Sequence, residues 1–252
     1  MAQFIPPTLA SEPVFHIGSF AVRNTHITSV LTLCVLLAIA LVLRNKKYQL
    51  VPGGFQNFFE IVIGGLFNFF DQIVGDREKT KRFFPLVTTI FLYVIISNWM
   101  GLLPGFGSIG LWETHDGHEI LVPILRSTFA DVNMTFALAL ISVTACQIFG
   151  FSMLGFKGYG GKFFINPLKN PVGCFVGLLE LMSEVSKMIS FSFRLFGNVF
   201  AGEVLLLVIT FLVPYAAPLP FYGLEIFVGF IQALVFGFLT LVFLKIATTS
   251  HH

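Results

Sequence analysis

The chain has 252 residues, of which 56% are hydrophobic and 11% carry a charge, and its mean hydropathy is +0.86. Ordinary soluble domains carry about 25% charged residues, so this composition excludes a soluble globular protein and indicates a polytopic integral membrane protein. The net charge of +2 does not indicate a nucleic-acid partner, because the basic residues stand in short clusters at the ends of apolar segments.

The first membrane span is predicted at residues 27–43, directly before the basic residues Arg44, Lys46 and Lys47. The preceding stretch, MAQFIPPTLASEPVFHIGSF, has no basic start followed by an apolar run and a cleavage site. No signal peptide is therefore predicted.

The second apolar stretch, residues 55–74, is long enough to cross a membrane but is predicted to lie along its surface. On a helical wheel its polar side chains fall within an arc of roughly 160°, opposite Phe, Ile, Leu and Val. The basic clusters RNKK and DREKTKR flank the stretch, and a spanning helix would leave one of them outside, against the positive-inside rule. The segment is therefore interpreted as an in-plane amphipathic helix. Its polar residues are Gln56, Asn57, Glu60, Asn68, Asp71 and Gln72.

Two further spans are predicted at residues 85–103 and 129–154. An acidic loop lies between them, and a loop with three lysines, residues 155–170, follows the second. Assigning the basic loops to the inner side places the N-terminus outside, residues 46–82 inside, residues 105–127 outside and the lysine loop inside.

The last two apolar segments are longer than a bilayer requires. Residues 172–213 contain no proline and would form a helix of roughly 60 Å, twice the thickness of the hydrocarbon core, and residues 221–248 one of roughly 40 Å. The stretch PYAAPLP between them is typical of a turn. Helices this long must tilt, kink or run partly along the membrane plane, and we predict a long, steeply tilted C-terminal hairpin that ends on the inner side. The predicted fold is all-α, a single membrane domain over residues 1–252 with about five spanning helices and one in-plane helix.

A group of ionisable and polar residues lies within these last two segments. On the wheel, Arg194 shares a stripe about 80° wide with four polar residues, whereas Glu203 lies on the opposite face. Glu225 and Gln232 share a face of the final segment. The other members of the stripe are Glu180, Glu184, Lys187 and Asn198, with Ser183 and Ser190 beside its edge.

Two interpretations of this group remain open from the residues alone. The charges either pair in a static buried network, which suits the spacing of Glu184 and Lys187, or they mark an ion pathway, as ionisable groups inside membranes often do. An arginine does not release its proton and cannot relay one. Arg194 can instead supply a fixed positive charge beside a carboxylate, while carboxylates on either side relay protons.

Other candidate sites are weaker. The stretch ETHDGHEI offers His115 and His118 beside acids, but in an outside loop it is interpreted as a solvated polar turn and not a metal site. The stretch GFKGYGGKF lacks the first glycine and the Ser/Thr of a phosphate-binding loop, so no nucleotide, cofactor or metal site is expected. Asp131 is most simply a helix N-cap or first-turn acid, and the alternative is a place at the mouth of an outer aqueous channel.

The stretch SFRLFGNVFAGE, residues 192–203, resembles a highly specific motif of the membrane a-subunit, or subunit 6, of F-type ATP synthases. The blocks SNWMGLLPG, DVNMTFALAL, LLELMSEVSK and IQALVFGFLTLVFL are similar to other blocks of that family and follow in the same order. The resemblance implies a proton-translocating stator subunit of the bacterial plasma membrane or the mitochondrial inner membrane. Its implied partners are a ring of c-subunits, b-type peripheral-stalk subunits and a soluble head that performs the ATP chemistry, so the chain would not be an enzyme on its own.

The resemblance also implies roles residue by residue. Arg194 would face the ring carboxylates and separate two offset half-channels. Glu225 stands where many bacterial relatives have histidine and the mitochondrial form has an acid, and Glu184 stands where some relatives are apolar. The implied outer half-channel contains Glu203, Glu225, Asn198 and Gln232, and the implied inner one contains Glu180 and Ser183, with Glu184 and Lys187 beside them.

Two other function classes are alternatives. A secondary transporter in which Arg194 binds an anionic substrate would be expected to have internal repeats and broken helices, and the sequence indicates neither. A passive scaffold predicts that an apolar residue can replace Arg194 with little loss of coupled proton flow.

Overall fold

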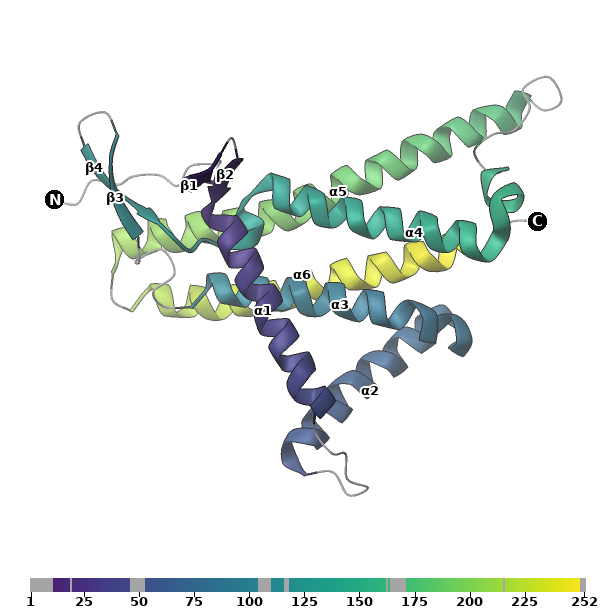
Figure 1. The fold of residues 1–252 in the computed structure, drawn as a ribbon, viewed down its shortest axis with the longest axis horizontal. Coiled ribbons are helices and arrows are strands. Elements are labelled where there is room, and N and C mark those ends of the chain that lie inside the picture. The colour runs from purple at the N-terminus through teal and green to yellow at the C-terminus, as the bar shows by residue number, and fades with distance from the viewer. Residues whose placement is uncertain are drawn as a thin grey trace. The chain divides into compact units, whose positions relative to one another are not determined.

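The computed structural model of the chain describes residues 11–18, 20–45, 53–103, 110–115, 118–161, 163, 171–214 and 216–249. In chain order its elements are β1 (Pro13–Ile17), β2 (Phe20–Arg23), α1 (Asn24–Asn45), α2 (Gly54–Val74), α3 (Arg77–Gly101), β3 (Gly110–His115), β4 (His118–Pro123), η1 (Thr128–Ala130), α4 (Val132–Gly160), α5 (Pro171–Leu212) and α6 (Pro218–Ala247) (Figure 1). Among the described helices, 5 are long and apolar enough to cross a membrane: α1, α3, α4 as far as Gly155, α5 and α6. The predicted all-α, polytopic membrane fold is confirmed.

The start of α3 depends on a cap that the apolar pattern does not reveal. The helix begins at Arg77, before the predicted start at Pro85. Asp76 Oδ1 accepts hydrogen bonds from the backbone N–H groups of Glu78 and Lys79, at 3.0 and 3.3 Å. These N–H groups have no partner within a helix, so the cap stabilises a polar first turn ahead of the apolar segment.

Two other helix boundaries follow from glycine and proline. α4 is interrupted at Gly155, whose φ of 74° and ψ of 163° are not helical, so the predicted end at residue 154 coincides with this break. α6 begins at Pro218 and not at residue 221, because proline is favoured at the first helical position, where its missing N–H costs nothing.

Two short antiparallel hairpins, β1–β2 and β3–β4, are additions to the predicted helices. The first leads directly into α1 (Figure 1). The second is closed by the pairing of His115 with His118. Strands of four to six residues carry too little alternation of polar and apolar residues to be predicted with the long helices.

α1 buries its polar residues and exposes its apolar ones. Ser29 and Tyr93 of α3 share a hydrogen bond between their hydroxyl oxygens at 2.7 Å, and Thr32 lies 3.4 Å from Ser97 Oγ of α3. On the other side of α1, Leu37 is 63% exposed. In lipid, polar groups are satisfied against other helices and apolar groups face the hydrocarbon, so this arrangement is that of a membrane helix.

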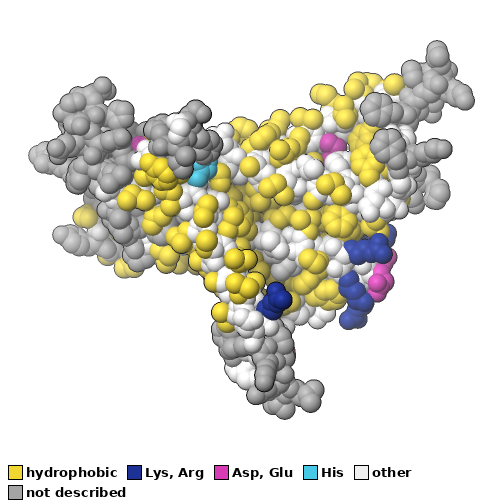
Figure 2. Space-filling model, viewed as in Figure 1, with side chains coloured by type: hydrophobic (Ala, Val, Ile, Leu, Met, Phe, Trp, Pro, Cys, Tyr) yellow, Lys and Arg dark blue, Asp and Glu magenta, His cyan; other side chains and the backbone are white. Residues whose placement is uncertain are grey.

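The described surface is largely apolar elsewhere too. Figure 2 shows hydrophobic side chains over much of the described part of this face, with Lys, Arg and acidic side chains gathered in small groups. Large exposed apolar side chains include Ile148 at 62% and Phe193 at 58%. Contiguous apolar surface of this kind marks contact with lipid or with another membrane subunit.

The chain divides into two compact units. The first unit contains Met1–Arg44, Leu92–Thr135 and Ser192–Leu234, and the second contains Asn45–Phe91, Phe136–Phe191 and Val235–His252. The core of the second unit is formed by buried residues of α2, α3, α4 and α6, namely Phe70, Val74, Phe83, Val87, Cys146, Leu241 and Leu244.

Lys245, near the end of α6, secures α2 in the second unit. Its Nζ donates a hydrogen bond of 2.8 Å to the backbone carbonyl of Ile73 in the last turn of α2. Cations are stabilising at helix C-termini, where carbonyl groups lack helical partners.

Candidate functional site

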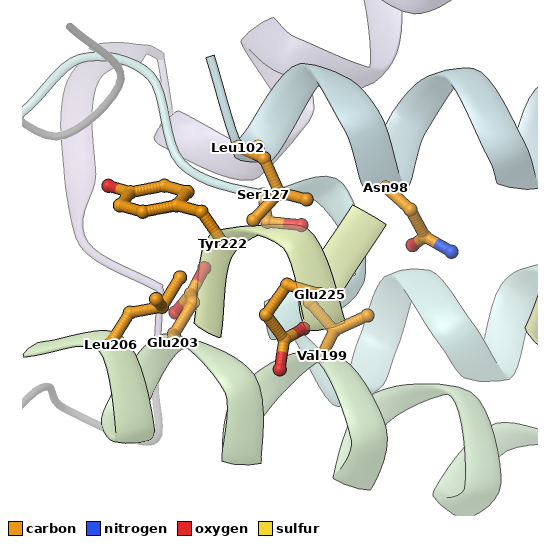
Figure 3. A pocket seen from close by; sticks show the side chains of 9 residues that line it. Asn98, Leu102, Ser127, Val199, Glu203, Leu206, Tyr222 and Glu225 are labelled. Atoms are coloured by element: carbon orange, nitrogen blue, oxygen red, sulfur yellow. The ribbon is translucent and has the colours of Figure 1, made fainter. Parts of the chain in front are cut away.

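The first unit contains a cavity of about 70 Å³ (Figure 3). One ordered water needs roughly 10–15 Å³ of such volume, so several water molecules would fit. Its walls come from α3, α5, α6 and the segment before η1, and two carboxyl groups lie among otherwise mostly apolar or uncharged neighbours. The lining residues are Asn98, Gly101, Leu102, Ser127, Val199, Glu203, Leu206, Tyr222 and Glu225.

Glu203 is held in this cavity by an ion pair with Arg126. Both Nε and Nη2 of Arg126 donate to Glu203 Oε2, at 3.3 and 3.2 Å. The Arg126 side chain is 10% exposed and the Glu203 side chain 28%. Arg126 was not predicted as a site residue. Its position just before the predicted span that contains the DVNMT block is a signal that could have identified it.

Glu225 is a residue of α6, and its carboxylate lies against α5 at Gly202. A Cβ added at Gly202 would fall on the Glu225 carboxylate, so the missing side chain at Gly202 is what gives this carboxylate its space. Within the described ranges, Glu225 has no ion pair or hydrogen bond of its own.

Several buried polar atoms of the first unit have no hydrogen-bond partner within the described residues. Asn98 Nδ2 donates to the carbonyl of Gly229 at 3.1 Å, but its Oδ1 meets no donor among the residues that the structure describes. The same holds for Ser127 Oγ and for Nε2 of Gln232. Buried polar atoms are usually hydrogen-bonded, so those that line the cavity favour water inside it.

Arg194 lies on α5 in the first unit. Its side chain is exposed, while Ser192 and Leu195 beside it are buried. Asn198 follows one turn later on the same helical face and donates from Nδ2 to Gln232 Oε1 on α6 at 3.4 Å. The structure thus brings together Asn198 and Gln232, and it brings Glu203 and Glu225 into one cavity.

A second polar cluster lies in the second unit, where α4 and α5 supply most of its members. Lys187 Nζ is 2.6 Å from Glu184 Oε1 and 4.7 Å from the centre of the Phe243 ring. Gln147 Nε2 donates to Glu184 Oε2 at 2.8 Å, and Tyr159 donates its hydroxyl to Gln147 Oε1 at 2.7 Å. Gln147 and Tyr159 were not predicted, because nothing in the local pattern of α4 indicates what a distant helix places opposite.

Burial and the negative charge of Glu184 raise the pKa of Tyr159 to about 12, so its hydroxyl stays protonated and acts as a donor. Each carboxylate oxygen of Glu184 thus accepts a hydrogen bond, as expected for a fixed ion pair. Of the predicted inner residues, Glu180 is half-buried and Ser183 is exposed on the same helix.

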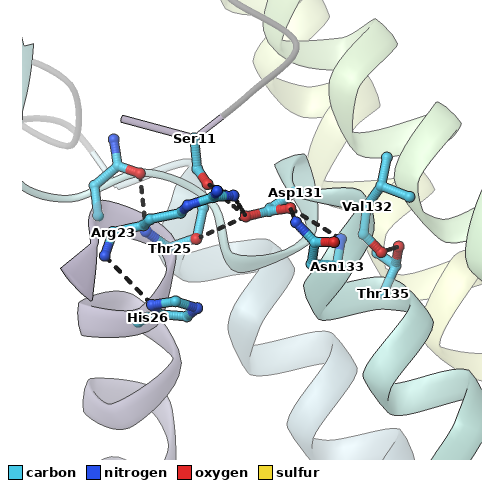
Figure 4. A network of polar contacts seen from close by, with 9 residues as sticks. Ser11, Arg23, Thr25, His26, Asp131, Val132, Asn133 and Thr135 are labelled. Carbon is cyan, nitrogen blue, oxygen red and sulfur yellow. Dashed lines mark hydrogen bonds and ion pairs between the residues drawn. The ribbon is translucent and has the colours of Figure 1, made fainter. Parts of the chain in front are cut away.

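Asp131 forms a third polar cluster at the start of α4 (Figure 4). Its Oδ1 accepts from the backbone N–H of Asn133 at 2.9 Å, which caps the helix. Its Oδ2 accepts from the hydroxyls of Ser11 and Thr25 and lies 3.6 Å from Arg23 Nη1. Burial alone would raise the pKa of Asp131, but these hydrogen bonds and the charge of Arg23 outweigh it and hold the pKa below its usual range.

Some predicted features lie outside the described residues. They are the lysines at 46, 47, 162 and 169, and the side chains of His115, His118 and Lys157. In the part of the chain that is described, no group of 3 or more His, Cys, Asp or Glu residues is arranged to hold a metal ion.

The chain is similar to known proteins over most of its length. A family model described as "ATP synthase A chain" matches residues 26–245. Two curated relatives are named "ATP synthase subunit a", from Campylobacter jejuni subsp. jejuni serotype O:23/36 (strain 81-176) and from Campylobacter jejuni (strain RM1221). Each is 33% identical over 228 residues, which cover 88% of this chain and 88% of the relative.

Proposed function

The chain belongs to the ATP synthase A chain family, and on this premise we propose that it is the proton-translocating stator subunit of a rotary F-type ATP synthase. It works within the membrane part of the complex, against a ring of c-subunits and beside b-type subunits of the peripheral stalk. ATP is formed or hydrolysed on the soluble head of the complex and not on this chain. The membrane is a bacterial plasma membrane or a mitochondrial inner membrane, with the N-terminus outside and the C-terminus on the cytoplasmic or matrix side.

The observation that carries the proposal is the cavity that contains both Glu203 and Glu225. Ionisable groups between membrane-spanning helices are costly and commonly mark ion pathways. The cavity has space for water, and polar atoms that have no partner among the described residues line it. The amide pair of Asn198 and Gln232 adds further polar groups on α5 and α6, the same two helices.

A proton enters from the outer side through this cavity and neutralises a carboxylate of the ring. The neutral site can then rotate into lipid, where a charged one would be strongly disfavoured. After nearly a full turn it meets the inner half-channel beside Glu180 and Ser183 and releases its proton there. The Glu184–Lys187 ion pair supports this inner group, and α2 lies along the inner membrane surface.

Arg194 separates the two half-channels. An arginine does not release its proton and so cannot relay one, which prevents protons from passing directly from one half-channel to the other. It also attracts a ring carboxylate that has lost its proton and so favours proton release. Each proton that moves down about 100 mV supplies about 2.3 kcal/mol, so several protons are needed for each ATP.

The experiment is ATP-driven proton pumping in membrane vesicles that carry Arg194→Ala, together with passive proton leak through the same membranes. We expect pumping to vanish and leak to rise while the complex still assembles. Arg82→Ala is the matched control, since Arg82 is an exposed arginine at the start of α3. Pumping near the unsubstituted rate in Arg194→Ala would contradict the proposal and favour a passive scaffold.

A further inference from the structure

The two carboxyl groups of the cavity have different surroundings. Glu203 receives two hydrogen bonds from the nearly buried guanidinium of Arg126. Glu225 has no ion pair or hydrogen bond with any described residue, and its carboxylate lies over the open space at Gly202. Within the described residues, the cavity therefore contains one paired and one unpaired carboxyl group.

This difference decides which carboxyl group can change its protonation state. A positive charge within about 4–6 Å favours the ionised form of a carboxyl group, and a guanidinium does not lose its own proton. A carboxyl group between apolar helices without such a partner favours its neutral form and binds a proton more readily.

We propose that Arg126 is a positioning residue whose charge and two hydrogen bonds favour the ionised form of Glu203, so that Glu225 is the group of this cavity that takes up and passes on protons. The inference rests on the proposed function and assigns the two carboxyl groups separate roles within it. In each cycle the Glu225 carboxylate accepts a proton that cavity water relays from the outer side, becomes neutral, and is ionised again when it passes this proton to a ring carboxylate. The Arg126–Glu203 pair is neutral overall and stays so throughout.

The remaining groups of the cavity fit these roles. The charged or titratable groups that line it are Glu203, Glu225 and Tyr222, and Arg126 reaches it through Glu203. Asn98 Oδ1 and Ser127 Oγ, which lack partners in the described part of the chain, can bind the water that delivers the proton. The amide of Asn98 and the hydroxyl of Ser127 do not change their protonation state at physiological pH, so Glu225 is left as the proton acceptor.

The test uses the whole complex in vesicles and compares ATP-driven proton pumping, after equal assembly is verified, in five variants. We expect Glu225→Gln to reduce pumping to background. Glu203→Gln should reduce it only about threefold. Arg126→Gln leaves an uncompensated carboxylate and should reduce pumping by about tenfold, and Arg126→Lys should restore part of the loss. The double variant Arg126→Gln/Glu203→Gln should pump at least as well as Glu203→Gln alone, because Glu203→Gln leaves the charge of Arg126 uncompensated, whereas both positions are neutral in the double variant.

The pH profile separates positioning from a merely structural role. In Arg126→Gln, Glu203 becomes able to bind a proton, so the pH dependence of pumping should change, and it should return to its original form in the double variant. Lys81→Gln is the matched control, because the Lys81–Glu78 ion pair of 2.8 Å is exposed (56% and 79%) and distant in sequence from the cavity residues.

Three results would overturn the inference. If Glu203→Gln abolishes pumping and Glu225→Gln does not, the roles are reversed. If the double variant pumps no better than Arg126→Gln and the pH profile is unchanged, Arg126 is structural only. If Glu203→Gln and Glu225→Gln both pump at the unsubstituted rate, protons do not pass through this cavity and the proposed function fails at its outer half-channel, a result distinct from the first two.

Discussion

Replacing Lys187 tests whether the cluster around Glu184 is a fixed ion pair or part of the proton route. The two groups are 2.6 Å apart, and their side chains are 21% and 17% exposed. Removing one member of a buried pair costs about 3–5 kcal/mol because the other charge is left uncompensated. Since this pair is partly exposed, we expect Lys187→Met to cost about 2–3 kcal/mol.

Glu184→Gln should cost less, about 1 kcal/mol, because the amide oxygen can still accept the hydrogen bond from Lys187, although the amide NH2 group cannot accept the one from Gln147. In a chain of this size, 1 kcal/mol corresponds to about 2–4 °C in the melting temperature. Lys187→Met should therefore lower the temperature of heat inactivation by about 4–12 °C and Glu184→Gln by about 2–4 °C. The double variant should cost about 1–2 kcal/mol less than the sum of the two.

The assay is ATP-driven proton pumping of vesicles after heating at a series of temperatures. At temperatures below inactivation, all three variants should pump at nearly the unsubstituted rate. If Glu184→Gln stopped pumping at every temperature while the assembled complex kept its heat resistance, Glu184 would be a proton carrier and the reasoning from the ion pair would be wrong.

Three further predictions concern positions with close contacts or perturbed titration. In Gly150→Ala the new Cβ would lie 2.6 Å from the buried ring of Tyr159, so the substitution should cost about 1–3 kcal/mol in heat-inactivation assays. Gly202→Ala should displace the Glu225 carboxylate and lower the pumping rate with little loss of stability, because a flexible side-chain end can move. The folded pKa of Asp131 lies below its unfolded value near 4, so its stabilisation is present above that value and is lost as the pH falls through the folded pKa. Asp131→Asn should lower stability at pH 7 by about 1–3 kcal/mol and remove this acid-dependent loss.

Controls for the glycine substitutions are available in α4 and α6. A Cβ at Gly158 would meet only Leu154 at 3.7 Å, and a Cβ at Gly223 would meet nothing within 4 Å. Gly158→Ala and Gly223→Ala should therefore leave stability and pumping nearly unchanged. Equal effects of Gly150→Ala and Gly158→Ala would mean that helix propensity and not the contact with Tyr159 decides the result, and unchanged pumping in Gly202→Ala would mean that Glu225 need not lie where it does. For Asp131→Asn, an acid-dependent loss like that of the unsubstituted protein would assign this loss to other carboxyl groups.

The amino-acid sequence by itself determined the class of the fold and the family. Long apolar runs have one stable arrangement in lipid, since only a helix satisfies all its backbone groups within the segment, and so the long helices could be predicted near their observed positions. The spacing of Glu184 and Lys187 by three residues indicated a local ion pair, because neighbours on one helix are fixed by its periodicity. The stretch around Arg194 and the order of the other blocks carried the resemblance to the family.

Only the tertiary structure decided which distant residues meet. Arg126 and Glu203 are 77 positions apart, and neither helical period nor composition relates a residue in a loop to a side chain of α5. The space that Gly202 leaves for Glu225 and the amide of Gln147 against Glu184 likewise depend on how one helix packs against another. Local periodicity specifies which face of a helix is polar, but the partner of that face is set by packing, and packing is what distinguishes a paired carboxylate from an unpaired one.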